Sequence, residues 1–146
     1  MDAIVMLKDE HKQVEKLFKA LEKDDLSVVP KICEALTLHA AVEESIFYPA
    51  VNKEAEDEQD EIAEAYEEHH LVKILIAELQ DLDPSDIAYK AKATVLMELV
   101  RHHVEEEEDE MFPEVRSQLG RKRLQEIGTD MEAFEKKTGP KLKASA

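Results

Sequence analysis

The chain has 146 residues, the length of one ordinary domain, and 43% of them are hydrophobic, which is enough for a single core. Its 19 basic and 35 acidic residues give a net charge of −16, which repels nucleic acid and anionic membranes and excludes them as expected partners. Because Cys33 is the only cysteine, an intrachain disulfide and a thiolate zinc site are excluded as well.

The N-terminal run MDAIVMLKDEH is too short in apolar residues for a signal peptide, and no stretch approaches the roughly 20 apolar residues of a membrane span. We therefore expect a cytoplasmic protein. Glycine and proline are scarce, strong helix formers dominate, and no alternating β-type run occurs. These features predict an all-α fold.

Apolar residues at three- and four-residue steps predict a first helix over about residues 2–23, with a stripe that passes through His11. A second helix is expected from a cap at Ser27 to about residue 51. Its apolar face is interrupted by His39 and Glu43. Two polar residues on a core-facing stripe need a partner inside the core.

The acidic stretch 54–61 predicts a loop and the start of a third helix, whose stripe crosses His69. Residues 83–85, Asp-Pro-Ser, predict a turn and a cap before a fourth helix, which carries His103 and Glu107. The apolar residues expected to lead this helix are Ile87, Ala91, Leu96, Leu99 and Val100.

Short connections between these helices predict an up-down-up-down four-helix bundle over residues 1–118. Gly120, Gly128 and Gly139 break the remainder, which predicts one or two short C-terminal helices packed on the end, then a frayed KLKASA tail. We expect residues 119–146 to be an extension of the bundle and not an independent domain. A monomer is favoured.

Each helix thus carries a histidine on its core stripe, and a buried imidazole costs free energy unless its nitrogens are satisfied. A single core histidine usually bonds to a backbone carbonyl, but four in register indicate one shared metal site. On two helices a glutamate follows four residues later, on the same face and ~6 Å along the axis. The candidate ligands are His11, His39, Glu43, His69, His103 and Glu107.

Two segments align as an internal repeat, HAAVEESIFYP and HVEEEEDEMFP, with the histidine ten residues before the proline in both. The alignment selects His103 over His102 and Glu107 over Glu106. Helical phase agrees, because a glutamate stands four residues before His102 whereas a leucine stands four before His103.

The first and third helices repeat in a similar way, because apolar residues follow both His11 and His69 at three and seven positions. If His70 faced the core instead, Lys73 would face it too. We therefore prefer His69 as the ligand from the third helix.

Four imidazoles and two carboxylates suit borderline divalent metals and divide into two positions, each with two nitrogens and one carboxylate. Structural zinc needs four ligands and catalytic zinc usually three, fewer than this set supplies. We predict two oxo- or hydroxo-bridged iron ions, with manganese as the alternative and zinc disfavoured. Open coordination positions are expected to face an apolar pocket near Phe47 and Met111, where dioxygen, peroxide or nitric oxide would bind.

The order His, H-x-x-x-E, His, H-x-x-x-E between about Leu7 and Pro113 resembles the hemerythrin-like, or HHE cation-binding, family. The resemblance implies that the four histidines named above are iron ligands and that Glu43 and Glu107 bridge the two irons. Related proteins bind oxygen, decompose peroxide or handle nitric oxide, so we expect binding of, or reaction with, a small oxidant. Catalase-like peroxide decomposition is the candidate enzymatic activity.

One histidine of the oxygen-carrying hemerythrins is missing here. Their third helix has an H-x-x-x-H pair, but Lys73 follows four residues after His69. This departure argues against reversible oxygen carriage and leaves a position open or filled by an oxygen donor. Tyr66, one turn before His69, is a candidate donor or else a core-edge tyrosine that faces water, while Tyr48 is disfavoured by its helical phase.

Three other functions compete with this prediction. The first is an iron or oxygen sensor, or a storage protein, without catalysis. The second is a ferritin-like carboxylate site, which requires two E-x-x-H motifs where this chain has only Glu67 with His70. The third is a bundle with buried histidines and no metal, which a metal analysis would separate from the rest.

Overall fold

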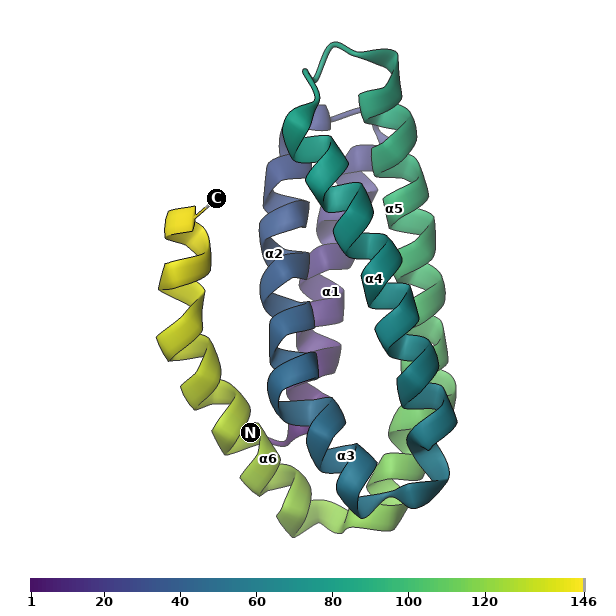
Figure 1. Cartoon of the computed structure of the whole chain (residues 1–146), viewed down its shortest axis with the longest axis vertical. Helices are drawn as coiled ribbons and strands as arrows, with labels where there is room; N and C mark the ends of the chain where they lie inside the picture. Colours follow the sequence, from purple (N-terminus) through teal and green to yellow (C-terminus); the bar gives the residue numbers. More distant parts are fainter. Residues whose placement is uncertain (146) are drawn as a thin grey trace.

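Four antiparallel helical columns form the body of the molecule, and a further helix lies outside them (Figure 1). This computed structural model describes residues 1–145 and the side chains of residues 1–142. The helical elements are α1 (Ala3–Glu22), η1 (Leu26–Val28), α2 (Val29–Val42), η2 (Glu43–Phe47), α3 (Tyr48–Glu54), η3 (Glu56–Glu58), α4 (Gln59–Asp81), α5 (Ile87–Glu106), η4 (Glu107–Met111) and α6 (Phe112–Ser145). The predicted all-α four-helix bundle is confirmed. None of the helices within these residues is long and apolar enough to cross a membrane.

One wider turn follows each H-x-x-x-E motif. Both η2 and η4 are π-helical turns, which continue directly into α3 and α6. A π turn holds one residue more than an α turn, so side chains after it are rotated relative to the α-helical phase. As a result the adjacent pairs Phe47–Tyr48 and Met111–Phe112 are all buried.

Two helix starts differ from the prediction. Ser27 does not cap the second helix, because the Asp25 carboxylate accepts both the Ser27 N–H and the Ser27 hydroxyl. The Asp83 carboxylate similarly accepts from Ser85 within the turn, while Asp86 caps α5. In both places an aspartate carboxylate accepts the N–H two residues on, a local bond that competes with a serine cap.

The first turns of α5 also face differently from the prediction. Ile87 is 90% exposed and Ala91 is exposed, whereas Tyr89 and Ala93 are buried. From Tyr89 onward the buried residues follow alternating four- and three-residue steps that lead to His103. The stripe that carries the histidine therefore determines which residues face the core, and Ile87 lies off that stripe.

The C-terminal part is longer and better packed than predicted. At Gly120, φ is +82°, and the chain bends there before one helix runs to Ser145. This helix passes back along the outside of α1 and α2 (Figure 1). Gly128 and Gly139 stay within it, so they do not divide it into short helices. The predicted frayed tail is helical as far as Ser145, and Ala146 lies outside the described residues.

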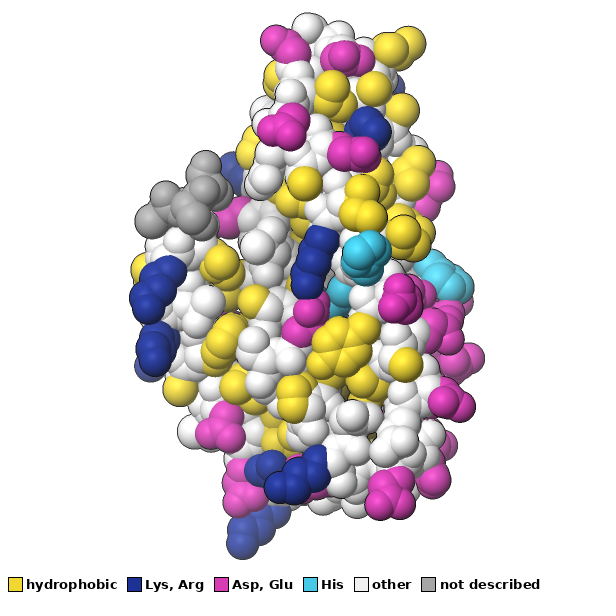
Figure 2. All heavy atoms as spheres, in the orientation of Figure 1, with side chains coloured by type: hydrophobic (Ala, Val, Ile, Leu, Met, Phe, Trp, Pro, Cys, Tyr) yellow, Lys and Arg dark blue, Asp and Glu magenta, His cyan; other side chains and the backbone are white. Residues whose placement is uncertain are grey.

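Buried apolar side chains form two clusters, and a polar layer contacts both. One cluster includes Phe18 and Leu96, and the other includes Phe47, Tyr48 and Phe112. On the face shown in Figure 2, acidic side chains gather over α4 and α5, while most of the basic ones lie over α6. The buried polar layer between the helices is the candidate site.

Candidate metal centre

The six predicted ligands meet in the core of the bundle. All are at most 8% exposed. Ligand atoms of His11, His39, Glu43 and Glu107 lie within 4.8 Å of one another, and so do those of Glu43, His69 and His103. The neighbouring histidines, His70 and His102, are exposed. The preference for His69 and His103, made from helical phase, thus agrees with the positions of these side chains.

The imidazoles form two pairs, one from α1 and α2 and one from α4 and α5. The pairs are His11 with His39 and His69 with His103, each with ring centroids 4.9 Å apart. Glu43 Oε1 lies between them, 3.2 Å from His39 Nε2 and 3.1 Å from His69 Nε2. This carboxylate therefore reaches one imidazole of each pair.

The second carboxylate occupies the equivalent place on the other side. Glu107 Oε1 is 3.2 Å from His11 Nε2 and 3.5 Å from His103 Nε2. Each helix with an H-x-x-x-E motif thus places its glutamate between the two imidazole pairs. Two cations, one at each pair, would share both carboxylates, which is the arrangement that bridging ligands require.

The outer nitrogen of every imidazole faces a further carboxylate. The contacts are His11 Nδ1 with Glu108 at 2.6 Å, His39 Nδ1 with Glu10 at 2.6 Å, His69 Nδ1 with Glu44 at 2.8 Å and His103 Nδ1 with Glu68 at 2.6 Å. An Nδ1–H that donates to a carboxylate fixes the tautomer and leaves the Nε2 lone pair free for a metal. All four rings are therefore oriented as metal ligands.

These four outer glutamates were not predicted, although the sequence contains their pattern. Each is the chain neighbour of a candidate ligand: Glu10 precedes His11, Glu68 precedes His69, Glu44 follows Glu43 and Glu108 follows Glu107. The pattern repeats in both halves of the chain and could have identified them. Which imidazole each one contacts depends on helix packing, because every contact crosses from one helix to another.

The unsatisfied atoms of the cluster test whether a metal fits. Among the described residues, five of its buried ligand atoms have no hydrogen-bond partner: His11 Nε2, His39 Nε2, Glu43 Oε1, Glu43 Oε2 and Glu107 Oε1. Leaving a buried polar group unpaired costs about 1–3 kcal/mol. Cations between the imidazoles and carboxylates would satisfy all five, and the nitrogen and oxygen donors suit a borderline divalent metal.

Without a metal, the charges of the cluster compensate one another. Burial by itself lowers the pKa of His39 and of His103, but the neighbouring carboxylates, Glu43 and Glu107 respectively, raise each pKa well above its usual value. Burial likewise raises the pKa of Glu43, while His39 and hydrogen bonds hold it well below its usual value. Protonated imidazoles thus take the place that metal charge would fill.

Tyr48 is a member of the site that the sequence argument missed. It is fully buried, and its hydroxyl donates to Glu107 Oε2 at 2.6 Å. The Tyr48 hydroxyl oxygen also lies 3.3 Å from His103 Nε2 and 3.5 Å from His69 Nε2. Burial, with Glu107 and Glu43 close by, raises the pKa of Tyr48 well above its usual value, so the phenol keeps its proton in this cluster.

The π turn η2 is the physical reason why helical phase alone misplaces Tyr48. In an unbroken α-helix only one of two adjacent residues, Phe47 or Tyr48, would point at the cluster, whereas the extra residue of η2 buries both. Tyr66 is 38% exposed, and its hydroxyl donates to the Glu44 carbonyl at 3.5 Å. Of these two tyrosines, Tyr48 is therefore the one whose hydroxyl lies beside the imidazoles of α4 and α5.

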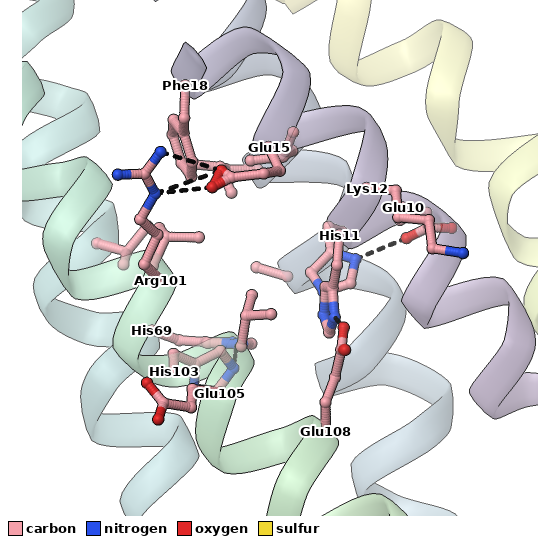
Figure 3. A pocket seen from close by; sticks show the side chains of 17 residues that line it. Glu10, His11, Lys12, Glu15, Phe18, His69, Arg101, His103, Glu105 and Glu108 are labelled. Carbon is pink, nitrogen blue, oxygen red and sulfur yellow. Dashed lines mark hydrogen bonds and ion pairs between the residues drawn. The ribbon is translucent and has the colours of Figure 1, made fainter. Parts of the chain in front are cut away.

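An apolar cavity opens onto the four histidines, but not where it was expected. Its volume is about 310 Å³, and Phe47 and Met111 do not line it. Its walls come instead from the other half of the bundle, including Phe18, Val72 and Val100. In Figure 3, His69 and His103 lie on one side of this space and His11 lies on the other.

Comparison with known proteins identifies the class of this site. Residues 2–115 match the family described as Hemerythrin, hemerythrin HHE cation binding domain. The chain belongs to this family, and it is a metal-cation-binding domain. A crystal structure of a hemerythrin HHE cation-binding domain-containing protein from Mycobacterium kansasii has the same fold, with a TM-score of 0.79 and 22% identity over 97% of this chain and 89% of that one.

A curated relative is a longer protein. The chain is 25% identical over 146 residues to a protein from Nostoc sp. named DNA nickase. The alignment covers 97% of this chain but only 41% of that protein. The chain thus spans less than half the length of this relative.

Proposed function

We propose that the chain holds two iron ions and that this centre binds or reacts with a small oxidant, namely dioxygen, hydrogen peroxide or nitric oxide. The proposed ligands are His11, His39, Glu43, His69, His103 and Glu107. One observation carries the proposal. All four imidazoles present Nε2 to two shared carboxylates, while Nδ1 of each is held by an outer glutamate.

The chain's own residues would divide the work. The outer carboxylates orient the rings and make the nitrogens more basic, as acidic partners of metal-bound histidines do. Glu43 and Glu107, one from each repeat, set the spacing between the two ions. The metals would supply Lewis acidity and electrons for an oxidant bound at an open position.

Tyr48 distinguishes one metal position from the other. Its hydroxyl lies beside His69 and His103, on the helix pair that lacks the additional histidine of oxygen-carrying hemerythrins. In this structure the phenol donates its one hydrogen to Glu107, and a ligand held beside these two imidazoles would compete with that carboxylate for it. Such a donor favours reaction with a peroxide over simple storage of dioxygen.

The DNA-directed name of the Nostoc relative supports no similar proposal for this chain. A net charge of −16 opposes contact with phosphates, which supply most of the affinity in protein–DNA complexes. The match also covers less than half of that protein. We propose that the partners of this domain are small molecules.

Metal analysis of aerobically purified protein, together with an optical spectrum, tests the centre. We expect two irons per chain and near-ultraviolet bands of an oxo bridge. His39→Ala and Glu107→Ala should lose iron, whereas His102→Ala, at an exposed histidine next to a candidate ligand, should retain it. Wild-type protein that takes up no metal after anaerobic iron reconstitution would contradict the proposal, and so would equal loss in the His102 variant.

Peroxide decomposition requires a separate assay. Iron-loaded protein should release oxygen promptly when hydrogen peroxide is added, and the Glu107→Ala variant should not. If a sample with full iron content releases no oxygen, the proposal of catalase-like activity is contradicted, but the proposal of a metal centre is not. Binding of dioxygen or nitric oxide to the reduced protein would then be followed by its visible spectrum.

A further inference from the structure

The cavity above the histidines is larger than a diatomic oxidant needs. Its volume of about 310 Å³ is roughly twice that of a cavity of about 150 Å³ that accommodates benzene in another protein. A water molecule occupies only about 30 Å³ in the liquid. The space therefore fits an organic molecule of about ten non-hydrogen atoms.

Every helix of the bundle contributes an apolar wall to this cavity. The apolar lining includes Val14 and Phe18 from α1, Leu36 from α2, Val72 from α4, and Val100 and Val104 from α5. Its polar end carries the four imidazoles, His11, His39, His69 and His103. A ligand that matches both ends has an apolar body and one oxygen-bearing group.

The opening of the cavity disfavours an anionic ligand. Half-buried or exposed side chains border it, and they include Glu10, Glu15, Glu105 and Glu108 against the basic Lys12 and Arg101. The Arg101 guanidinium donates to Glu15 (Figure 3). It also donates to Glu22, so one guanidinium faces two carboxylates and the border keeps a net acidic charge. The acidic side chains at the border would repel fatty acids and other carboxylates, whereas they would not repel an uncharged molecule.

We propose that this cavity binds an uncharged organic hydroperoxide, with its apolar body among the valines, Leu36 and Phe18 and its peroxide oxygens toward the imidazoles. The inference rests on the proposed function for the oxygen end of the ligand. The apolar part of the site stands on the cavity alone. An organic peroxide is therefore preferred over hydrogen peroxide because only the organic molecule fills the apolar space.

Binding is tested first with an unreactive probe. Calorimetric titration of the purified protein with 2-phenyl-2-propanol, the alcohol that corresponds to cumene hydroperoxide, should show saturable binding at one site. Val104→Phe adds a ring at a half-buried wall position of α5 and should weaken binding at least tenfold. The matched control is Val95→Phe on the same helix, at a 45% exposed position outside the cavity, and it should bind like wild type.

Selectivity is tested next with iron-loaded protein. In the reduced protein the two proposed ferrous ions would supply the two electrons, and solvent the two protons, that convert cumene hydroperoxide to 2-phenyl-2-propanol and water. The rate at which one equivalent of cumene hydroperoxide oxidises the reduced protein, relative to the rate with hydrogen peroxide, should fall at least tenfold in Val104→Phe and stay constant in Val95→Phe. If Val104→Phe does not fold, Ala40→Val narrows the cavity from α2 and should produce the same two losses.

The outcomes separate this inference from the metal proposal. No probe binding to wild-type protein, or equal binding by the two phenylalanine variants, would overturn the organic ligand even if iron is present. If the protein takes up no iron but binds the probe in a way that depends on Val104, the apolar ligand site is supported and the proposed metal centre is contradicted.

Discussion

Tyr48 makes the two halves of the candidate metal centre chemically unequal. The internal repeat pairs Tyr48 with Phe112, because each directly precedes the proline of its segment. Both side chains are buried and follow a π turn. The His69 and His103 pair therefore faces a hydroxyl. The His11 ring is instead stacked with Phe112, with centroids 6.0 Å apart. An oxidant would meet a hydrogen-bond donor at only one position.

Tyr48→Phe tests that inequality. We expect iron affinity to fall by about 10- to 100-fold, the usual cost of losing an outer partner of a metal ligand, because the Glu107 carboxylate loses its donor. Competition with a coloured chelator measures the change. The control is Tyr66→Phe, which should leave iron affinity unchanged. It removes an exposed hydroxyl that makes one long hydrogen bond, 3.5 Å, to a backbone carbonyl. Equal effects of the two variants would contradict the role of Tyr48.

How much of the site the sequence could predict depends on what each residue needs. The six candidate ligands were found because they are polar residues on apolar stripes, and periodicity alone places them in the core. The outer glutamates lie on the edges of those stripes, where a charged residue is ordinarily solvated. Tyr48 required knowledge of a π turn, which changes the phase by one residue and leaves no mark in the hydrophobic pattern.

Glu135 on α6 gives the site a pH-dependent neighbour. It lies against Glu10, the carboxylate that accepts from His39, and burial together with Glu10 raises the pKa of Glu135 to about 8. A raised carboxyl pKa contributes stability that is complete below the unfolded value of about 4.5 and is lost as pH rises to about 8. Above that range the Glu10 and Glu135 carboxylates repel each other beside His39.

Glu135→Gln should remove this loss. Because an amide can donate to Glu10 at any pH, the variant should melt about 2–4 °C higher than wild type at pH 8, on the order of 1 kcal/mol after allowance for the partly exposed carboxyl. The advantage should shrink toward pH 4.5. Melting curves from pH 4 to 9 measure it, with the exposed Glu126→Gln on the same helix as the control. Parallel curves for wild type and Glu135→Gln would contradict the prediction.

At the scale of helices, long amphipathic stripes were predictable and their ends were not. The first helix begins after its Asp2 cap and ends within one residue of the predicted limit. Starts near Ser27 and Ser85 depended on which of two nearby polar residues accepts the N–H groups, a competition of local hydrogen bonds. The division between a bundle of residues 1–118 and a dependent extension of residues 119–146 stays a prediction.

The prediction of short C-terminal helices is wrong because only Gly120 interrupts the helical backbone of α6, whereas Gly128 and Gly139 lie within the helix. Gly120 does bend the chain, with φ at +82°, but Gly128 is a packing residue. A Cβ there would collide with the Met1 carbonyl oxygen and lie 3.0 Å from the Ala3 nitrogen. Gly128 therefore permits α6 to lie directly against the N-terminus, beside the buried Ile127.

Gly128→Ala and Gly139→Ala should consequently have opposite effects on stability. Alanine at position 128 meets backbone atoms, which cannot rotate away, and overpacking of this kind costs about 1–3 kcal/mol. A Cβ at position 139 would lie 3.8 Å from Leu38 Cδ2, an ordinary contact, so the helix-forming gain of about 0.5–1 kcal/mol should remain. Chemical denaturation measures both. Destabilisation by both variants to the same extent would show that position 128 has no special packing.

At the scale of the whole molecule, a bound metal would connect the four helices and compensate the negative charge that is buried between them. The net charge of −16 opposes compaction, and two of the acidic side chains, Glu43 and Glu107, are buried at the centre. Their compensation in the metal-free state comes from protonated His39 and His103, whose pKa values are raised. Metal ions would replace that compensation with charge that does not titrate away.

This exchange predicts how stability depends on pH with and without metal. A raised histidine pKa gives stability that is complete below about pH 6.5 and is lost as pH rises through the folded value, so metal-free protein should melt at lower temperatures from pH 7 to 9. The iron-loaded protein should not show this loss. At a free iron concentration 100 times the dissociation constant, metal binding should raise the free energy of unfolding by about 2.7 kcal/mol. The difference in stability between the iron-loaded and metal-free proteins should therefore widen as pH rises.

The same exchange predicts that metal binding releases protons, because an imidazole must be neutral to coordinate. Anaerobic addition of ferrous ion to weakly buffered, metal-free protein at pH 7 should acidify the solution, and the acidification should diminish as pH rises through the raised pKa values of His39 and His103. A pH indicator measures it, and His102→Ala should behave like wild type. If metal-free and iron-loaded proteins melt alike and no protons appear, occupancy does not control the bundle. A sensor that reports iron through bundle stability would then be excluded, whereas a catalytic centre would not.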